Sequence, residues 1–143
     1  LQASVRHEPR LVHWVAATDR LDAALHAWHG LSIDPGSARA ASRDTPQGPL
    51  HWRITVRDDG RRQFDGTLPT LIEWQGTHPV DAMAGSDVQL VALRLRHPRA
   101  DALRTALDAV ELGGVDVQAG AAASIVAELL TPKGRVLVAS VAT

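Results

Sequence analysis

The chain has 143 residues, enough for one domain, and its 45% hydrophobic and 22% charged residues are ordinary values for a globular protein. The net charge of -1 argues against a general nucleic-acid-binding protein, and the lack of cysteine excludes disulfides, thiol catalysis and thiolate metal sites. No apolar run approaches the roughly 20 residues that span a bilayer, and the polar N-terminus does not resemble a signal peptide. We expect a cytoplasmic protein, although the start at Leu1 leaves open whether a leader was removed.

The first half of the chain predicts a strand, a helix and further strands. Residues 11–17 predict a short strand, and Thr18 or Asp19 can cap a helix over residues 19–29, which Gly30 ends. Residues rich in Pro, Gly, Ser and Ala follow, and they predict a loop over 31–50 with one short edge strand. The next strands are expected at 50–57 and 68–75, separated by a turn at Asp59-Gly60 and followed by a connecting loop over 76–87.

The second half repeats this order. A strand is expected over 88–96 and a helix from about 100 to 112, which Gly113-Gly114 ends. Three strands follow, at 115–118, 124–130 and 135–142. The period of about 75 residues predicts a duplication. We therefore expect an α+β fold within a single domain over 1–143, with two tandem β-α-β-β-β modules, about 11–76 and about 88–142. The modules would form a concave mixed sheet with helices on the outer face.

Two of the predicted strands separate polar from apolar side chains, because alternate residues on a strand point to the same face. If the strands pair side by side, one face carries His51, Arg53, Thr55, Leu71, Glu73 and Gln75. The other face carries Trp52, Ile54, Val56, Ile72 and Trp74. This division predicts a sheet whose apolar side lies against helices and whose polar side faces a pocket.

The four tryptophans leave the choice of face open. Our first interpretation places Trp14, Trp52 and Trp74 in the core, opposite His13, Arg53 and Glu73, with Trp28 on the helix completing that core. The alternative reverses the faces, so that the tryptophans line an apolar pocket. Strand phase alone does not decide between them.

Several stretches resemble the vicinal oxygen chelate superfamily, which includes glyoxalase I, extradiol dioxygenases and bleomycin-resistance proteins. The specific ones are S-R-D-T-P-Q-G-P-L-H-W-R and L-P-T-L-I-E-W-Q-G-T-H-P; weaker ones are L-V-H-W-V-A-A-T-D-R-L-D-A-A, L-R-L-R-H-P-R-A-D-A-L-R-T-A-L and L-L-T-P-K-G-R-V-L-V. Together they cover most of residues 11–138, and the chain is most similar to the bacterial glyoxalase-like domain proteins. These usually have an additional N-terminal module with a His-containing, glycine-rich segment, and this chain resembles the later two-thirds of that arrangement.

The resemblance implies that a divalent metal, where present, is held by the first and last strands of modules. His13 and Glu73 fit that pattern in the first module, whereas the second module offers Leu90, Ala92 and Arg94, then Leu137 and Ala139. Two protein ligands make an incomplete set, since catalytic metals usually have three. A plain ion pair between Arg53 and Glu73 is the alternative.

Arg53 is the candidate for binding a carboxylate or phosphate, which a guanidinium grips with two hydrogen bonds; otherwise it covers the strand surface with its stem. His51 could act as an acid or base, or face solvent. The predicted ligand-binding residues are His51, Trp52, Arg53, Trp74 and His78. The pair Arg61-Arg62 is interpreted as a solvated rim.

Three functions remain open. The first is a small-molecule-binding protein that needs no metal. The second, implied by the resemblance, is a metal-dependent lyase, isomerase or dioxygenase acting on adjacent oxygens. The third is a module that pairs with another copy as a homodimer, which an exposed apolar sheet face would favour. Neither nucleic acid nor membrane is an expected partner.

Overall fold

A computed structural model describes residues 9–76 and 85–140 and contains two four-stranded mixed sheets and two α-helices. The first module comprises β1 (Val15–Ala17), α2 (Leu21–Gly30), β2 (Ser37–Thr45), β3 (Gly48–Val56), a short 3-10 turn η1 (Gln63–Gly66) and β4 (Thr70–Gln75). The second comprises β5 (Gln89–His97), α3 (Ala100–Ala109), β6 (Val115–Ala119), β7 (Ser124–Thr131) and β8 (Gly134–Ala139). The predicted α+β class and the two successive β-α-β-β-β modules are confirmed. No helix in these residues is long and apolar enough to cross a bilayer.

The modules repeat the order of elements along the chain but differ in the order of strands in the sheet. The first sheet runs β1-β4-β3-β2, with the first strand at the edge and parallel to the last. The second runs β6-β5-β7-β8, so its first strand is internal, parallel to β6 and antiparallel to β7. In the second module, α3 connects two neighbouring parallel strands, as a helical crossover does.

Within residues 31–50, expected as a loop with one short edge strand, the edge strand is present but longer than expected. Strand β2 spans nine residues and pairs along its whole length with β3, from Ser37 opposite Val56 to Thr45 opposite Gly48. Most of its side chains are exposed because it is the edge strand of its sheet. An edge strand needs no apolar pattern, so its Ser, Ala and Arg residues predicted a short strand and did not indicate its full length.

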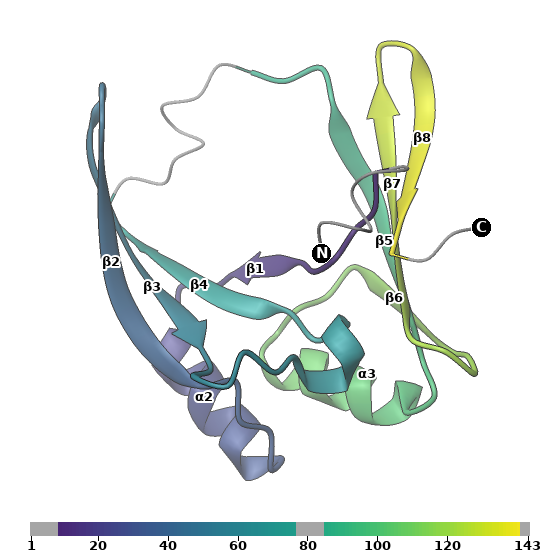
Figure 1. Cartoon of the computed structure of the whole chain (residues 1–143), viewed down its shortest axis with the longest axis horizontal. Coiled ribbons are helices and arrows are strands. Elements are labelled where there is room, and N and C mark those ends of the chain that lie inside the picture. Colours follow the sequence, from purple (N-terminus) through teal and green to yellow (C-terminus); the bar gives the residue numbers. More distant parts are fainter. Residues whose placement is uncertain (1–8, 77–84, 141–143) are drawn as a thin grey trace.

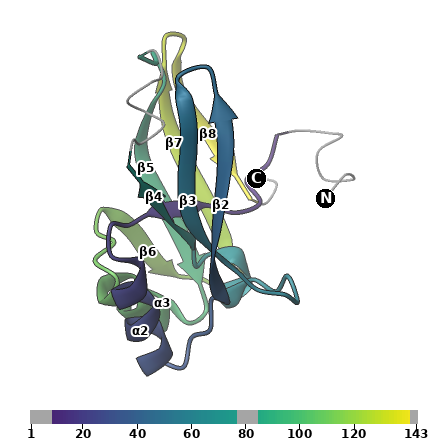
Figure 2. The ribbon, with the colours of Figure 1, turned by 90° about the vertical axis from the view of Figure 1, so that its left-hand side faces the viewer.

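Both helices lie together at the base from which the two sheets diverge (Figure 1). They contact each other through Trp28 of α2, which is fully buried and donates a hydrogen bond from Nε1 to the carbonyl oxygen of Ala106 in α3 (2.8 Å). A single core therefore joins the modules; its larger members are Leu21, Trp28, Leu71, Leu95, Leu103, Leu107 and Ile125. Figure 2 shows the β2–β3 hairpin extending away from this base.

Candidate functional site

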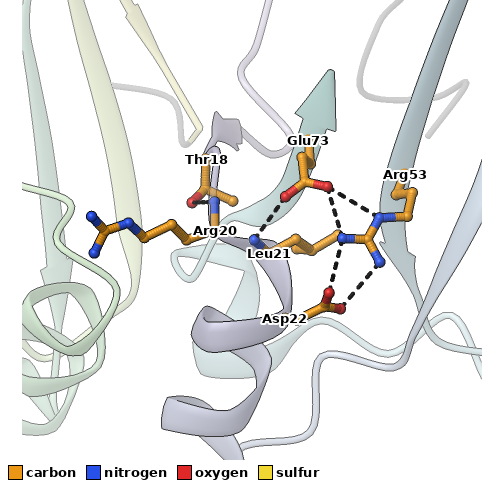
Figure 3. Close-up of polar contacts among 6 residues, drawn as sticks. All are labelled: Thr18, Arg20, Leu21, Asp22, Arg53 and Glu73. Carbon is orange, nitrogen blue, oxygen red and sulfur yellow. Dashed lines mark hydrogen bonds and ion pairs between the residues drawn. The ribbon is translucent and has the colours of Figure 1, made fainter. Parts of the chain in front are cut away.

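The predicted alignment of β3 with β4 is confirmed, and it brings together an ion-pair cluster at the start of α2 (Figure 3). Arg53 lies directly opposite Glu73 and donates hydrogen bonds from Nε (3.1 Å) and Nη2 (2.7 Å) to Glu73 Oε1. The same guanidinium donates to both carboxylate oxygens of Asp22 on α2 (3.1 and 3.2 Å). The other Glu73 oxygen accepts the backbone N–H of Leu21 (3.0 Å). Arg20 points away from the cluster.

In this cluster a carboxylate on strand β4, that of Glu73, caps the N-terminus of helix α2. The first turn of a helix has backbone N–H groups without partners, and a carboxylate there is also favoured by the helix dipole. The hydrogen bond from Leu21 and then the bonds from Arg53 lower the pKa of Glu73, while Asp22 and then Glu73 raise the pKa of Arg53. Of the expected caps, the Thr18 hydroxyl accepts the backbone N–H of Arg20 (3.1 Å), while Arg20 itself is the N-cap residue and its side chain makes no cap hydrogen bond. With two carboxylates on its guanidinium, Arg53 is not free to grip an anionic ligand.

The polar face of the first sheet is the one that faces α2, which reverses our first interpretation. Leu71 and Thr55 are buried on that face beside Arg53 and Glu73. Trp52 and Trp74 pack on each other on the opposite face, with ring centres 5.3 Å apart. The prediction that the tryptophans lie in the core is confirmed for Trp28 and Trp14 and is wrong for Trp52 and Trp74. Trp14 packs against the core and donates from Nε1 to the carbonyl oxygen of Thr67. Alternation separates two faces without telling which one a helix covers.

His13 lies at the end of the first sheet, with both ring nitrogens engaged. Nδ1 lies 3.1 Å from the carbonyl oxygen of Gly66, which can only accept, so Nδ1 carries the proton. Nε2 therefore accepts, from the hydroxyl (2.8 Å) and the backbone N–H (3.2 Å) of Thr70. Burial lowers the pKa of His13 and is the largest effect; the hydrogen bond to Gly66 raises it, and the charge of Arg62 lowers it further. The imidazole is thus held neutral, without a free lone pair.

The residues implied as metal ligands do not fit a metal. Thr70, which His13 contacts, lies three residues before Glu73 on the same strand, and so on its opposite face. The nitrogens of His13 and the oxygens of Glu73 already have partners. Within residues 9–76 and 85–140, no three His, Cys, Asp or Glu side chains group as metal ligands.

A pocket of about 220 Å³ lies beside His13, where β3 ends and β4 begins. Its apolar wall comes from Pro35, Val56, Leu68 and Pro69, and its polar lining residues are His13, Thr55, Arg57, Arg61, Arg62, Gln63 and Thr70. Three arginines on one small pocket make it strongly cationic, a property suited to an anionic ligand.

The arginines of the pocket differ in how far their charge is neutralised. Arg57 binds both oxygens of Asp59 (2.9 and 2.7 Å), and this pairing raises its pKa and lowers that of Asp59. Arg62 donates from Nη1 to the carbonyl oxygen of Val12 (2.9 Å) and, within the described residues, makes no ion pair. The Arg61 guanidinium has neither a hydrogen bond nor an ion pair with any part of the chain that the structure describes. Two guanidinium groups at the pocket therefore make no ion pair with the described residues, although the charge of Arg61 also helps to lower the pKa of nearby Asp59.

The remaining predicted ligand-binding residues are not part of this pocket. His51 is exposed on β3 opposite Gln75, Trp52 and Trp74 lie on the uncovered sheet face, and His78 is outside the described residues. The sequence indicated Arg61-Arg62 only as a solvated rim. Two adjacent arginines after a turn were the available signal, but the wall formed by Leu68 and Pro69 depends on the tertiary fold.

A family model described as "Glyoxalase-like domain" matches residues 1–111, most of the chain. The chain belongs to the glyoxalase-like domain family. This agrees with the resemblance in the sequence and places the protein in a superfamily whose members bind small molecules.

Comparison with solved structures adds support for the fold alone. The glyoxalase-like chain is similar to the crystal structure of a hypothetical protein from Staphylococcus aureus, with a TM-score of 0.51 and 10% sequence identity. The match covers 96% of this chain and 55% of that one, so this glyoxalase-like chain spans about half the length of its structural relative. No curated protein matches the sequence significantly.

Proposed function

We propose that this glyoxalase-like protein binds a small molecule carrying a carboxylate or phosphate group in the pocket beside His13. The observation that carries the proposal is the pair of arginines, Arg61 and Arg62, neither of which forms an ion pair with a carboxylate among the described residues, although Arg61 lies near enough to Asp59 to help lower its pKa. A guanidinium at a partly apolar pocket binds an anion favourably, because charge-assisted hydrogen bonds are stronger there than in open water.

The hydrogen bonds of His13 fit a protein that binds its ligand without catalysing a reaction. A general acid or base needs a ring nitrogen that reaches the substrate, and both nitrogens of His13 are held by Gly66 and Thr70. In this role His13, two residues before β1, fixes Gly66 and the start of β4 at Thr70, and so shapes the pocket. The pocket's cations would orient the acidic group, while the apolar wall would contact the remainder of the ligand.

The test is an NMR titration of the ¹⁵N-labelled chain with acetate and with inorganic phosphate at constant ionic strength. We expect saturable shifts at residues 60–70 and about tenfold weaker binding by Arg61→Gln, since a hydrogen bond to a charged group contributes about 1.5–3 kcal/mol. Arg94→Gln is the matched control, because Arg94 pairs with Glu128 in the second sheet and lines no part of this pocket. Shifts that never saturate, or equal weakening by both variants, would contradict the proposal.

The homodimer stays a prediction. The uncovered face of the first sheet carries exposed Val15 and Val56 beside Trp52 and Trp74. Size-exclusion chromatography with light scattering tests this prediction independently of ligand binding.

A further inference from the structure

A second pocket of about 360 Å³ adjoins the first across the same arginines. The two pockets share Arg57, Arg61, Arg62 and Gln63 as lining residues. Among the described residues, the other module lines the second pocket but not the first, through His97 at the end of β5 and Arg99 just before α3. The shared arginines thus border two neighbouring spaces rather than one.

Arg99 adds a third available cation. Its guanidinium carbon lies 4.9 Å from the centre of the Phe64 ring, a cation–π contact that positions the charge without neutralising it. Arg99 has no ion pair and no side-chain hydrogen bond to residues 9–76 or 85–140. It is exposed, so its replacement removes a charge without opening the core.

The loop that carries this second pocket is fixed in shape. Phe64 and Asp65 both have positive φ (53° and 55°), a conformation that is costly for residues other than glycine. Buried His97 holds them: its Nδ1 accepts the backbone N–H of Arg99 (2.9 Å), so Nε2 carries the proton and donates to Asp65 (3.0 Å). The second module thereby positions both Arg99 and the loop that bears the arginines.

The charges around the two pockets do not balance. Arg57 is paired with Asp59 and with Asp34, and among the described residues Asp65 is the one carboxylate that lines either pocket. Arg61, Arg62 and Arg99 face that single carboxylate, whose side chain is 75% exposed. Counted with Asp34 and Asp59, which pair with Arg57, and with Asp65, the four arginines leave an excess of one positive charge over both pockets.

We infer that the ligand carries two anionic groups, one bound beside His13 and the other in the adjoining pocket at Arg99. This inference rests on the proposed function and names its ligand class: a small molecule with two carboxylate or phosphate groups. Joining two anionic groups in one molecule strengthens binding, since the second group binds without a further loss of translational freedom.

The test compares acetate with the dicarboxylates from malonate to adipate at constant ionic strength, using the same NMR titration. We expect at least one dicarboxylate to bind at least tenfold more tightly than acetate. Arg99→Gln should abolish this advantage while leaving the dissociation constant of acetate within twofold, and Arg99→Lys should retain part of the advantage. Thermal unfolding of each variant, matched to the wild type, excludes a folding defect, and Arg94→Gln is again the control.

The outcomes separate the two proposals. If every dicarboxylate binds no better than acetate, or if Arg99→Gln leaves the ratio of their affinities unchanged, the two-anion inference is overturned and the simple anion site stands. If no probe binds the wild-type chain, the proposed function fails and the inference falls with it.

Discussion

Replacing Glu73 tests whether a strand carboxylate caps helix α2. Glu73→Ala removes the carboxylate that accepts the backbone N–H of Leu21, and Leu21 is fully buried. The capping hydrogen bond goes to a charged acceptor, and such a bond contributes about 1.5–3 kcal/mol. We therefore expect the free energy of unfolding to fall by about 2 kcal/mol. The melting temperature should fall by about 8 °C, at about 4 °C per kcal/mol for a chain of this length.

Glu73→Gln separates the hydrogen bond from the charge. The amide oxygen can still accept the Leu21 N–H, so we expect a loss of only about 1 kcal/mol, the difference between a charged and a neutral acceptor. Glu128→Ala is the matched control: Glu128 is also a mostly buried strand carboxylate and pairs with Arg94 and Arg135, but it caps no helix. Urea denaturation at pH 7 measures all three variants. Equal losses for the Ala and Gln variants would refute the capping role.

Acid provides a second measurement on the same group. The pKa of Glu73 is lowered in the folded chain, so the unfolded chain takes up the proton first as the pH falls. The stabilisation by this carboxylate is complete above its ordinary pKa of 4.5 and is lost as the pH falls through the lower folded value. The stability difference between the wild type and Glu73→Gln should therefore shrink below pH 4.5. A difference that stays constant into acid would show that the charge is not involved.

Three further predictions concern the helix contact, a tight backbone approach and His13. Trp28→Phe leaves the ring buried but removes the hydrogen bond across to α3, and urea denaturation should show a loss of about 1–3 kcal/mol; an unchanged midpoint would contradict the contact. Gly36→Ala would place a Cβ 2.0 Å from the carbonyl oxygen of Val56, at a φ of +93° that favours glycine, so the melting temperature of this variant should fall sharply. Gly30→Ala is the control: it has open space around it, and its melting temperature should change little. Burial lowers the pKa of His13, so the unfolded state binds the proton first and the chain should become less stable as the pH falls below 6.5. Urea denaturation at pH 7.5 and 5.5 measures this loss, and His13→Gln should remove the part of it that is due to His13.

The sequence determined which residues form strands and helices wherever side chains alternate or recur along one helical face. Strand β5 and helix α3 were predicted in this way, because apolar residues at those spacings must be buried together. The pairing of Arg53 with Glu73 also followed, since the turn between their strands and the alternation of polar residues limit the register. The family resemblance rested on the same stretches, and the match over residues 1–111 agrees with it.

The tertiary structure alone decided which face of each sheet the helices cover and which arginines keep a free charge. Alternation is symmetrical, so it could not tell that α2 lies over Arg53 and leaves Trp52 uncovered. An arginine's availability depends on whether a carboxylate from elsewhere in the chain reaches it. Asp22 reaches Arg53 from a helix 31 residues earlier, whereas no described carboxylate pairs with Arg61. Such long-range distances are set by the packing of the elements, and local sequence does not encode them.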